Sequence, residues 1–337
     1  MLGIPPALLA GRDVIEFGPG SGHNALFTAA LAPACYTLVD GNPRGVGETR
    51  ALLNRHGLGG ANVEVVQGDF ETYRNERAFD LVLAEGCLNF QRDPCALLRR
   101  IASFTRPGGV LVVTAVTPVS IVPELIRRLI RDSVVAPDAP PAVQLPILRP
   151  LFAAHLAALP GATRSLDDWL LDQIVKPIWD TETLALPDIL DALGDEFEAY
   201  GGSPHFLTDF RWYKRLDGPE RDFNSLALTC YRRQLATLLD HRFEPPSFAM
   251  GAALENACQA LWDCLRAVEG PSRRPIDVAA QCLMDIAALA FDTLPETAAA
   301  ISEGVDVLLR RRDPLRLAHL PAFWGRGQQY VSLIRRS

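Results

Sequence analysis

The chain has 337 residues, 48% of them hydrophobic and 22% charged, and it carries a formal net charge of −7. This is a soluble globular composition, and the length suits one large domain or two of ordinary size. The acidic balance argues against a general nucleic-acid partner, because binding to phosphates requires a basic surface.

Residues 1–116 alternate between short apolar runs and helical patterns. The apolar runs are continuous, as in parallel strands that are buried on both faces. This alternation predicts an open α/β fold with a doubly wound, mostly parallel sheet. Strands are expected at 13–17, 36–40, 63–69, 79–86 and 110–116, and helices at 23–32, 46–57 and 93–105.

The pattern changes after the fifth predicted strand. Residues 117–182 contain Pro-punctuated helical pieces and predict a helical insertion that could act as a lid. Residues 183–217 predict the completion of the sheet, with a strand at 197–206 and a further strand or structured loop at 209–216. Residues 218–337 contain long amphipathic helices. They predict an all-helical C-terminal domain, which is a candidate homodimer face.

A glycine-rich turn follows the first predicted strand, in the sequence VIEFGPGSGHNA (residues 14–25). A phosphate-binding P-loop needs Lys followed by Ser or Thr after its last glycine, and this turn has neither. A dinucleotide-binding turn needs the spacing GxGxxG, whereas the position three residues after the second glycine is His23 here. This spacing argues against a pyrophosphate bound at the following helix.

Further motifs follow the turn in order along the chain. Asp40 ends the second predicted strand, and Asp69 ends the third. The fourth strand lies within FDLVLAEGCLNF (79–90), and RPGGVLVV (106–113) enters the fifth. Together with the turn, which reads E-x-G-x-G-x-G, they resemble the motifs of the class I, Rossmann-like S-adenosylmethionine-dependent methyltransferases. The resemblance covers residues 11–116 and extends to 183–216.

This resemblance implies that the turn binds S-adenosylmethionine (SAM). Glycines let the backbone approach the ligand, and Glu16 attracts the SAM ammonium group directly or through water. Asn24 caps the following helix or contacts the SAM carboxylate. Asp40 accepts both ribose hydroxyls, Asp69 accepts the adenine amino group, and Phe70 lies against the adenine ring. The expected cofactor residues are Glu16, Phe17, Gly18, Pro19, Gly20, Gly22, Asn24, Asp40, Gly41, Asp69, Phe70 and Glu85.

The acceptor is less well defined by the sequence. Methyltransferases of amides and bases often carry the tetrad N/D-P-P-Y/F after the fourth strand, and AEGCLNF (84–90) lacks it. We therefore expect a small-molecule acceptor that is methylated on O or N. His205 is the candidate general base, because imidazole titrates near neutral pH. His23 and His155 compete with it for this role.

Three other interpretations of these motifs stay open. The same fold can bind SAM without methyl transfer, or transfer an aminopropyl group, which the lack of a paired-Asp polyamine site disfavours. An NAD(P)-dependent oxidoreductase also carries an acidic residue after its second strand, but the glycine spacing and Asp69 argue against it. A non-enzymatic partner protein would use its C-terminal helices as an interaction surface.

The seven cysteines form no CxxC pair. They are expected to be free thiols in a reducing compartment rather than disulfides or metal ligands. The segment MLGIPPALLAGRD (1–13) lacks the basic region of a signal peptide, and no apolar run reaches membrane-spanning length. We therefore expect a cytoplasmic protein with no metal site and no membrane contact.

Overall fold

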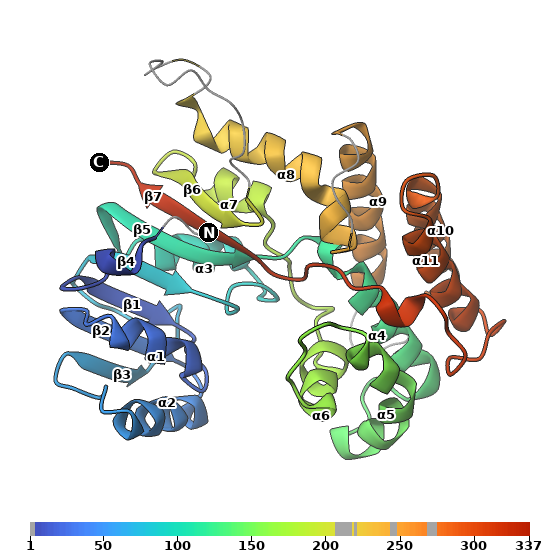
Figure 1. The fold of residues 1–337 in the computed structure, drawn as a ribbon, viewed down its shortest axis with the longest axis horizontal. Helices are drawn as coiled ribbons and strands as arrows, with labels where there is room; N and C mark the ends of the chain where they lie inside the picture. Colours follow the sequence, from blue (N-terminus) through green and yellow to red (C-terminus); the bar gives the residue numbers. More distant parts are fainter. Residues whose placement is uncertain (1–3, 206–217, 219–220, 243–247, 268–274) are drawn as a thin grey trace. The chain divides into compact units, whose positions relative to one another are not determined.

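The computed structural model divides the chain into two compact units (Figure 1). The described residues are 4–205, 218, 221–242, 248–267 and 275–337. Unit 1 comprises Met1–Val116, Glu182–Tyr231 and Gln328–Ser337. Unit 2 comprises Thr117–Thr181 and Arg232–Gly327. The chain therefore leaves unit 1 twice and returns to it twice.

Unit 1 is built on a seven-stranded sheet in the order β3-β2-β1-β4-β5-β7-β6. Strands β1 to β5 pair in parallel, whereas β7 is antiparallel to both β5 and β6. This sheet confirms the predicted mostly parallel α/β architecture. The strands are β1 Asp13–Phe17, β2 Cys35–Asp40, β3 Val63–Gln67, β4 Phe79–Ala84, β5 Thr105–Ala115, β6 Phe197–Ser203 and β7 Gln329–Arg335.

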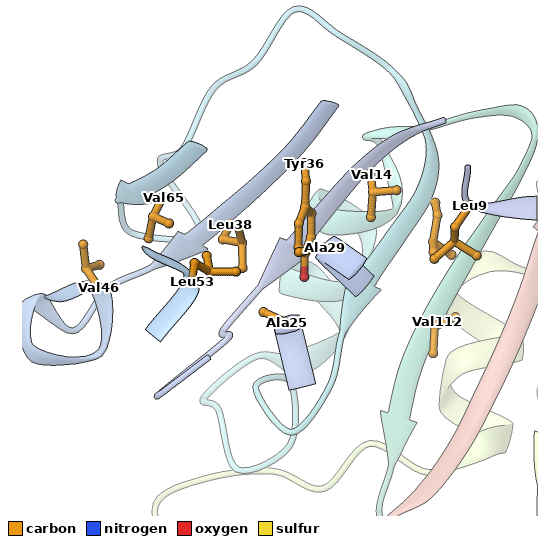
Figure 2. Close-up of a cluster of buried hydrophobic side chains, with 11 residues drawn as sticks. Leu9, Val14, Ala25, Ala29, Tyr36, Leu38, Val46, Leu53, Val65 and Val112 are labelled. Carbon is orange, nitrogen blue, oxygen red and sulfur yellow. The ribbon is translucent and has the colours of Figure 1, made fainter. Parts of the chain in front are cut away.

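Helices pack on the sheet of unit 1. They are α1 His23–Ala30, α2 Pro43–Arg55, α3 Pro94–Ala102 and α7 Leu186–Leu193, with a 3₁₀ turn at Pro6–Leu8. Figure 2 shows the core between one sheet face and helices α1 and α2, formed by Leu9, Val14, Ala25, Ala29, Tyr36, Leu38, Val46, Leu53, Val65, Leu81 and Val112. Side chains alternate along β1, so Phe17 lies on the opposite face. Its ring centroid is 5.4 Å from that of Phe104.

Local signals explain where α2 and α3 begin. The side chain of Asn42 accepts a hydrogen bond from the backbone N–H of Arg44 (3.0 Å), and that of Asp93 accepts one from Ala96 (2.8 Å). A proline follows each capping residue, and its fixed φ angle suits the first helical position. These caps satisfy backbone donors that the helix itself leaves unpaired.

Strand β7 corrects the prediction of an all-helical region over 218–337. The segment Gln329–Arg335 is a strand inserted between β5 and β6, where Ala115 pairs with Gln329. Val331, Ser332 and Leu333 are all buried, and so short a run in the sequence does not distinguish a strand from a buried helical segment. Its pairing partners lie far earlier in the chain, and only the tertiary structure brings them together.

Unit 2 is mainly helical and combines most of the predicted insertion with most of the predicted C-terminal region. Helix α8, Phe223–Leu239, begins in unit 1 and ends in unit 2. The α-helices of unit 2 are α4 Val122–Val134, α5 Pro141–Ala157, α6 Leu166–Trp169, α9 Phe248–Arg266, α10 Ile276–Ala290 and α11 Pro295–Leu308. Shorter helical segments are Pro118–Ile121, the π-helical Leu170–Val175 and Leu320–Ala322.

Buried arginines of α4 stabilise the end of the π-helical segment. Arg128 donates to the carbonyl oxygen of Ile174 (3.3 Å), and Arg131 donates to that of Val175 (3.3 Å). The last carbonyls of a helix have no partner inside the helix, and these guanidinium groups satisfy them. Burial lowers the pKa of Arg128 to about 9, so the group stays charged at neutral pH.

Three remaining expectations concern residues 209–216, membrane-spanning helices and metal ligands. Residues 209–216, expected as a strand or structured loop, lie outside the described residues. No helix in the described part of the chain is both long and apolar enough to cross a membrane. Within the same described ranges, no three or more His, Cys, Asp and Glu side chains are grouped so that they could hold a metal ion.

Substitution of Leu333 tests whether β7 packs inside the sheet, between β5 and β6. The Leu333 side chain is fully buried. We expect Leu333→Ala to lower the free energy of unfolding by about 2–5 kcal/mol, because truncation leaves a cavity in a packed core. Leu8→Ala is the matched control, since Leu8 is 53% exposed and its truncation should cost less than about 0.5 kcal/mol. Urea unfolding followed by circular dichroism measures both, and equal small losses would contradict the assignment.

Candidate functional site

The glycine-rich turn joins the carboxyl end of β1 to the start of α1. Gly18, Gly20 and Gly22 have φ angles of +76°, +57° and +83°, a region in which residues other than glycine are strained. The turn therefore needs these glycines for its backbone conformation. This confirms the strand–turn–helix context that the sequence predicts.

One side of the turn packs against β2 and α2. The N–H of Gly18 donates to the carbonyl oxygen of Val39 (2.9 Å), and the hydroxyl of Thr49 donates to the carbonyl oxygen of Gly20 (2.9 Å). A Cβ atom at Gly22 would lie 2.9 Å from the Thr49 backbone, so no side chain fits there. A Cβ atom at Gly20 would meet no atom within 4 Å. The turn is thus held from one side and open beside Gly20.

Asp40 ends β2, and its carboxylate shapes both neighbouring turns. Oδ2 accepts from the N–H of Gly20 (3.0 Å), and Oδ1 accepts from the N–H of Asn42 (2.8 Å). A carboxylate offers about four acceptor positions, so these two bonds leave others for a ligand. The sequence missed this role in the turns, because nothing local shows that residues 20 apart meet. The ribose contact expected of Asp40 stays a prediction.

Asp69 follows β3 at the same edge of the sheet, because β2 and β3 are parallel neighbours. Its Oδ1 accepts from the backbone N–H groups of Glu71 (2.9 Å) and Thr72 (3.1 Å). Asp69 is exposed, and Oδ2 has no hydrogen-bond partner among the residues that the structure describes. The residue therefore forms a turn and still presents one oxygen at the edge where Asp40 lies.

Phe70 and Cys87 line the turn next to Gly18. The Phe70 ring is half-buried, and its centroid lies 5.7 Å from that of Phe17 in an edge-on arrangement. A Cβ atom at Gly18 would lie 2.9 Å from the Cβ atom of Cys87 and 3.7 Å from the Phe70 ring. Burial raises the pKa of the Cys87 thiol to about 12, so it stays a neutral wall group rather than a nucleophile.

Glu16 is buried beneath the turn, on the sheet face that packs against α1. It accepts a hydrogen bond from the Tyr36 hydroxyl, and Tyr36 belongs to the core cluster of Figure 2. Desolvation by burial raises the pKa of Glu16 to about 7; the Tyr36 hydrogen bond opposes this shift, and the charge of Glu85 adds to it. A cation that approached Glu16 would lower this pKa. The expected contact with an ammonium group stays a prediction.

Glu85 follows β4 and lies near β5 and β7. The next N–H, that of Gly86, donates to the Thr114 hydroxyl in β5 (2.8 Å). Tyr330 of β7 pairs with Thr114, and a Cβ atom at Gly86 would lie 3.5 Å from the amide of Gln328. Sequence reasoning missed Tyr330 and Gln328, because β7, which begins directly after Gln328, was not predicted as a strand. The only sequence signal was the short apolar run after GRGQQ.

Asn89 has a structural role in the fourth-strand motif. Its Nδ2 donates to the carbonyl oxygen of Thr114 (2.7 Å), and its Oδ1 accepts from the N–H of Leu184 (3.0 Å). The N–H of Val116 also donates to the carbonyl oxygen of Leu184 (2.8 Å). The chain therefore leaves the sheet after β5 and returns to it at neighbouring points that Asn89 holds together.

Asn24 does not cap α1, and this half of its predicted role is wrong. The residue before the helix is Gly22, in a left-handed conformation with no side-chain cap, and Asn24 is exposed within the first turn. A ligand contact of Asn24 stays a prediction. Pro19 accepts from the N–H of Gly22 (2.9 Å), and Gly41 directly follows β2. Both therefore lie at the edge where the sequence places them.

His205 follows β6 and is exposed. β6 lies three strands from β4 in the sheet, and neighbouring strands are about 4.8 Å apart, so His205 is displaced by about 14 Å from the end of β4. This distance disfavours a direct role at the glycine turn. His205 as general base stays a prediction.

The two competing histidines lie in different surroundings. His23 is exposed at the start of α1, with Nδ1 2.9 Å from the hydroxyl oxygen of Ser21. His155 is buried in unit 2, and Arg127 Nε donates to its Nδ1 (3.1 Å). Burial, reinforced by the Arg127 charge, lowers the pKa of His155 to about 3. His155 is therefore a neutral packing residue, and its proposed competition as a base is wrong.

Comparison with known proteins places the similarity in the first part of the chain. A family profile described as a methyltransferase domain matches residues 2–149. A probable phthiotriol/phenolphthiotriol dimycocerosates methyltransferase 2 of Mycobacterium ulcerans is 35% identical over 113 residues, 33% of this chain and 42% of that relative. A tRNA U34 carboxymethyltransferase of Methylococcus capsulatus is 33% identical over 108 residues, 32% of this chain and 33% of that relative.

A solved structure is also similar in part. The N-methyltransferase NodS of Bradyrhizobium japonicum, in complex with S-adenosyl-l-homocysteine, aligns with a TM-score of 0.35 and 14% identity, over 58% of this chain and 72% of that chain. The chain spans less than half the length of either curated relative described above.

Glu16 makes the stability of unit 1 depend on pH. Its pKa rises from 4.5 to about 7 on folding, so its contribution is fully present below pH 4.5 and is lost as pH rises to 7. At about 1.4 kcal/mol per pKa unit, the advantage of Glu16→Gln over the natural chain should grow by about 2–3 kcal/mol between pH 5 and pH 8. Urea unfolding at both pH values measures this difference.

Glu64→Gln is the control for that measurement, because Glu64 is exposed on β3. Its effect on unfolding should be the same at both pH values. A Glu16→Gln effect that did not change with pH would mean that the Glu16 carboxyl ionises normally in the folded protein.

The sequence match and the geometry fall on the same part of the chain. Residues 2–149 include β1 to β5, the glycine turn, and the carboxylates that follow β2 and β3 at one edge of the sheet. Residues 2–149 therefore match the methyltransferase-domain family over the part of the chain that builds this edge of the sheet.

Proposed function

We propose that this protein is a SAM-dependent methyltransferase that transfers a methyl group to O or N of a small-molecule acceptor. The observation that carries the proposal is the open side of the glycine turn, where a Cβ atom at Gly20 would meet no atom within 4 Å. Asp40 and Asp69 lie at the edge of the sheet that bears this opening. This is the edge at which open α/β sheets bind their ligands.

Each part of SAM has a matching group along this edge. The remaining acceptor positions of Asp40 suit the two ribose hydroxyls, and Oδ2 of Asp69 suits the adenine amino group. The Phe70 ring offers a face against which adenine can lie. Glu16, buried and only partly ionised at neutral pH, suits the ammonium group. These groups contact the nucleoside and the amino acid, and none of them is a phosphate ligand.

Methyl transfer from a sulfonium is an in-line displacement. The donor supplies most of the driving force, so the protein must mainly align the acceptor with the methyl carbon, exclude water and accept a proton where necessary. The acceptor must approach from the side of β4, since the turn, β2 and β3 are assigned to the cofactor. Glu85, Tyr330 and Gln328 are the polar residues placed there.

Expectations about compartment, assembly and acceptor also belong to this proposal. We place the protein in the cytoplasm, because its seven cysteines are all free thiols. Dimerisation through the C-terminal helices and closure of the insertion as a lid stay predictions. A small-molecule acceptor agrees with the acidic composition, since nucleic acid would be repelled.

Cofactor binding and the role of Asp40 are tested together. We expect isothermal titration calorimetry to show binding of SAM and S-adenosylhomocysteine (SAH) but not of NADH. Asp40→Ala should weaken SAM binding by more than about tenfold, because both ribose hydroxyls lose an ionised acceptor. Asp195→Ala, at an exposed position, should leave the affinity unchanged. Binding of NADH alone, or an unaltered Kd in Asp40→Ala, would overturn the assignment.

Substitutions at two glycines with positive φ angles distinguish an effect on stability from an effect on cofactor binding. Gly11 (φ +70°) and Gly20 (φ +57°) each leave open space for a Cβ atom, but Gly11 precedes β1, at the opposite edge of the sheet. Alanine at either position should cost about 1–2 kcal/mol of stability through the left-handed conformation. Only Gly20→Ala should weaken SAM binding, because its methyl group enters the cofactor space. Equal SAM affinities of the two variants would argue that the open side of Gly20 is not the cofactor site.

A further inference from the structure

Glu85, Thr114 and Tyr330 occupy neighbouring positions at the ends of β4, β5 and β7, next to the proposed methyl donor. Ala84 of β4 pairs with Val113 of β5, so the next residue, Glu85, comes level with Thr114. Thr114 in turn pairs with Tyr330 of β7. Thr114 is short and its hydroxyl accepts the Gly86 N–H (2.8 Å). Glu85 and Tyr330 therefore flank a small residue at the ligand-binding edge of the sheet.

The electrostatics link Glu85 to both neighbours. Burial raises its pKa. Its charge acts on Glu16, beneath the glycine turn, and on the hydroxyl of Tyr330, whose pKa is raised by burial first and by Glu85 second. Neither Glu16 nor Glu85 has an ion-pair partner within the described ranges of the chain. Two partly buried carboxylates thus share this region without a protein cation.

We infer that the acceptor is a basic amine, that its ammonium group binds to Glu85, and that the Tyr330 hydroxyl orients the nitrogen toward the methyl donor. This inference rests on the proposed function, because it assumes SAM beside Gly20. It assigns to the acceptor a residue, Glu85, that the sequence groups with the cofactor. The SAM ammonium group already matches Glu16, so Glu85 is the carboxylate left for a second cation.

The surroundings of Glu85 favour an acceptor of one charge over the others. A partly buried carboxylate without a counter-ion is costly, and a ligand cation offsets that cost. A carboxylate acceptor would add a third negative charge close to Glu16 and Glu85, where like charges repel strongly in a low dielectric. A neutral alcohol would avoid the repulsion but give Glu85 no cation to bind other than the sulfonium of the donor. Among the three classes, the amine fits these surroundings best.

The reaction balances with these groups alone. The bound ammonium gives one proton to the Glu85 carboxylate and becomes a neutral amine with a free lone pair. That lone pair forms the N–C bond to the methyl carbon while the C–S bond breaks and its electrons stay on sulfur. The products are an N-methylammonium ion and SAH. Glu85 then releases its proton to water, and Tyr330 keeps its own proton throughout.

Three probes that share a phenyl ring test the charge of the acceptor. They are 2-phenylethylamine, 2-phenylethanol and phenylacetate, and SAH release with SAM in excess measures turnover. We expect release with the amine to exceed release with the other two. The increase in melting temperature of the SAH-loaded protein with each probe gives a second measurement that needs no turnover. A preference for the alcohol or the acid in both measurements, or no preference, would overturn the inference.

Substitutions test the proposed roles of Glu85 and Tyr330 in acceptor binding. Glu85→Gln should lower kcat/KM for the amine by about 100-fold or more, and should abolish the amine-dependent increase in melting temperature, with SAM Kd changed by less than about threefold. Tyr330→Phe should raise KM for the amine by roughly tenfold with little change in kcat. Glu64→Gln and Tyr200→Phe are matched controls at exposed positions of β3 and β6.

The outcomes separate this inference from the proposed function. If SAM binds and Glu85→Gln behaves like Glu64→Gln, the amine assignment is overturned while the methyltransferase proposal stands. If Tyr330→Phe lowers stability and kcat together, as a packing defect would, its orienting role is overturned. If the natural protein does not bind SAM in calorimetry, the proposed function itself fails.

Discussion

Parallel pairing of β1 to β5 brings the carboxyl ends of five strands to one edge of the sheet. Every group assigned to the site depends on this constraint, because each lies at or just after the end of a strand: the glycine turn, Asp40, Asp69 and Glu85. Asp40 makes the arrangement rigid, since its carboxylate bonds to the turn after β1 and to the start of α2. The grouping of these residues is therefore a consequence of strand pairing, and one buried side chain keeps it in place.

Parts of this site could be predicted from the sequence because their signals are local. The three glycines, Asp40 and Asp69 each follow an apolar run, and strand direction alone puts them at one edge. Contacts between distant segments could not be predicted this way. Cys87 lies against Gly18, and Tyr330 lies opposite Thr114, through pairings that no periodicity encodes. Likewise, nothing in the sequence indicates that His155 is buried and bonded to Arg127 of another helix.

The site also balances stability against binding. Glu16 is buried beneath the turn, and its one hydrogen bond, from the Tyr36 hydroxyl, only partly offsets desolvation, so its ionisation in the folded protein is unfavourable. Glu85 adds a second carboxylate close by, which raises the same cost. Functional sites commonly retain such unfavourable groups, because a ligand that compensates them binds more tightly. A cationic cofactor and a cationic acceptor would each compensate one carboxylate, so the occupied site would be more stable than the empty one.

The antiparallel strand between β5 and β6 has a consequence for how the protein is made. β6 is complete at Ser203, but the strand that joins it to the rest of the sheet begins only at Gln329. At ordinary translation rates of about 5–20 residues per second, roughly 6–25 s separate the two on the ribosome. During that interval β5 and β6 both expose unpaired edges, which is when a chaperone would be of most use.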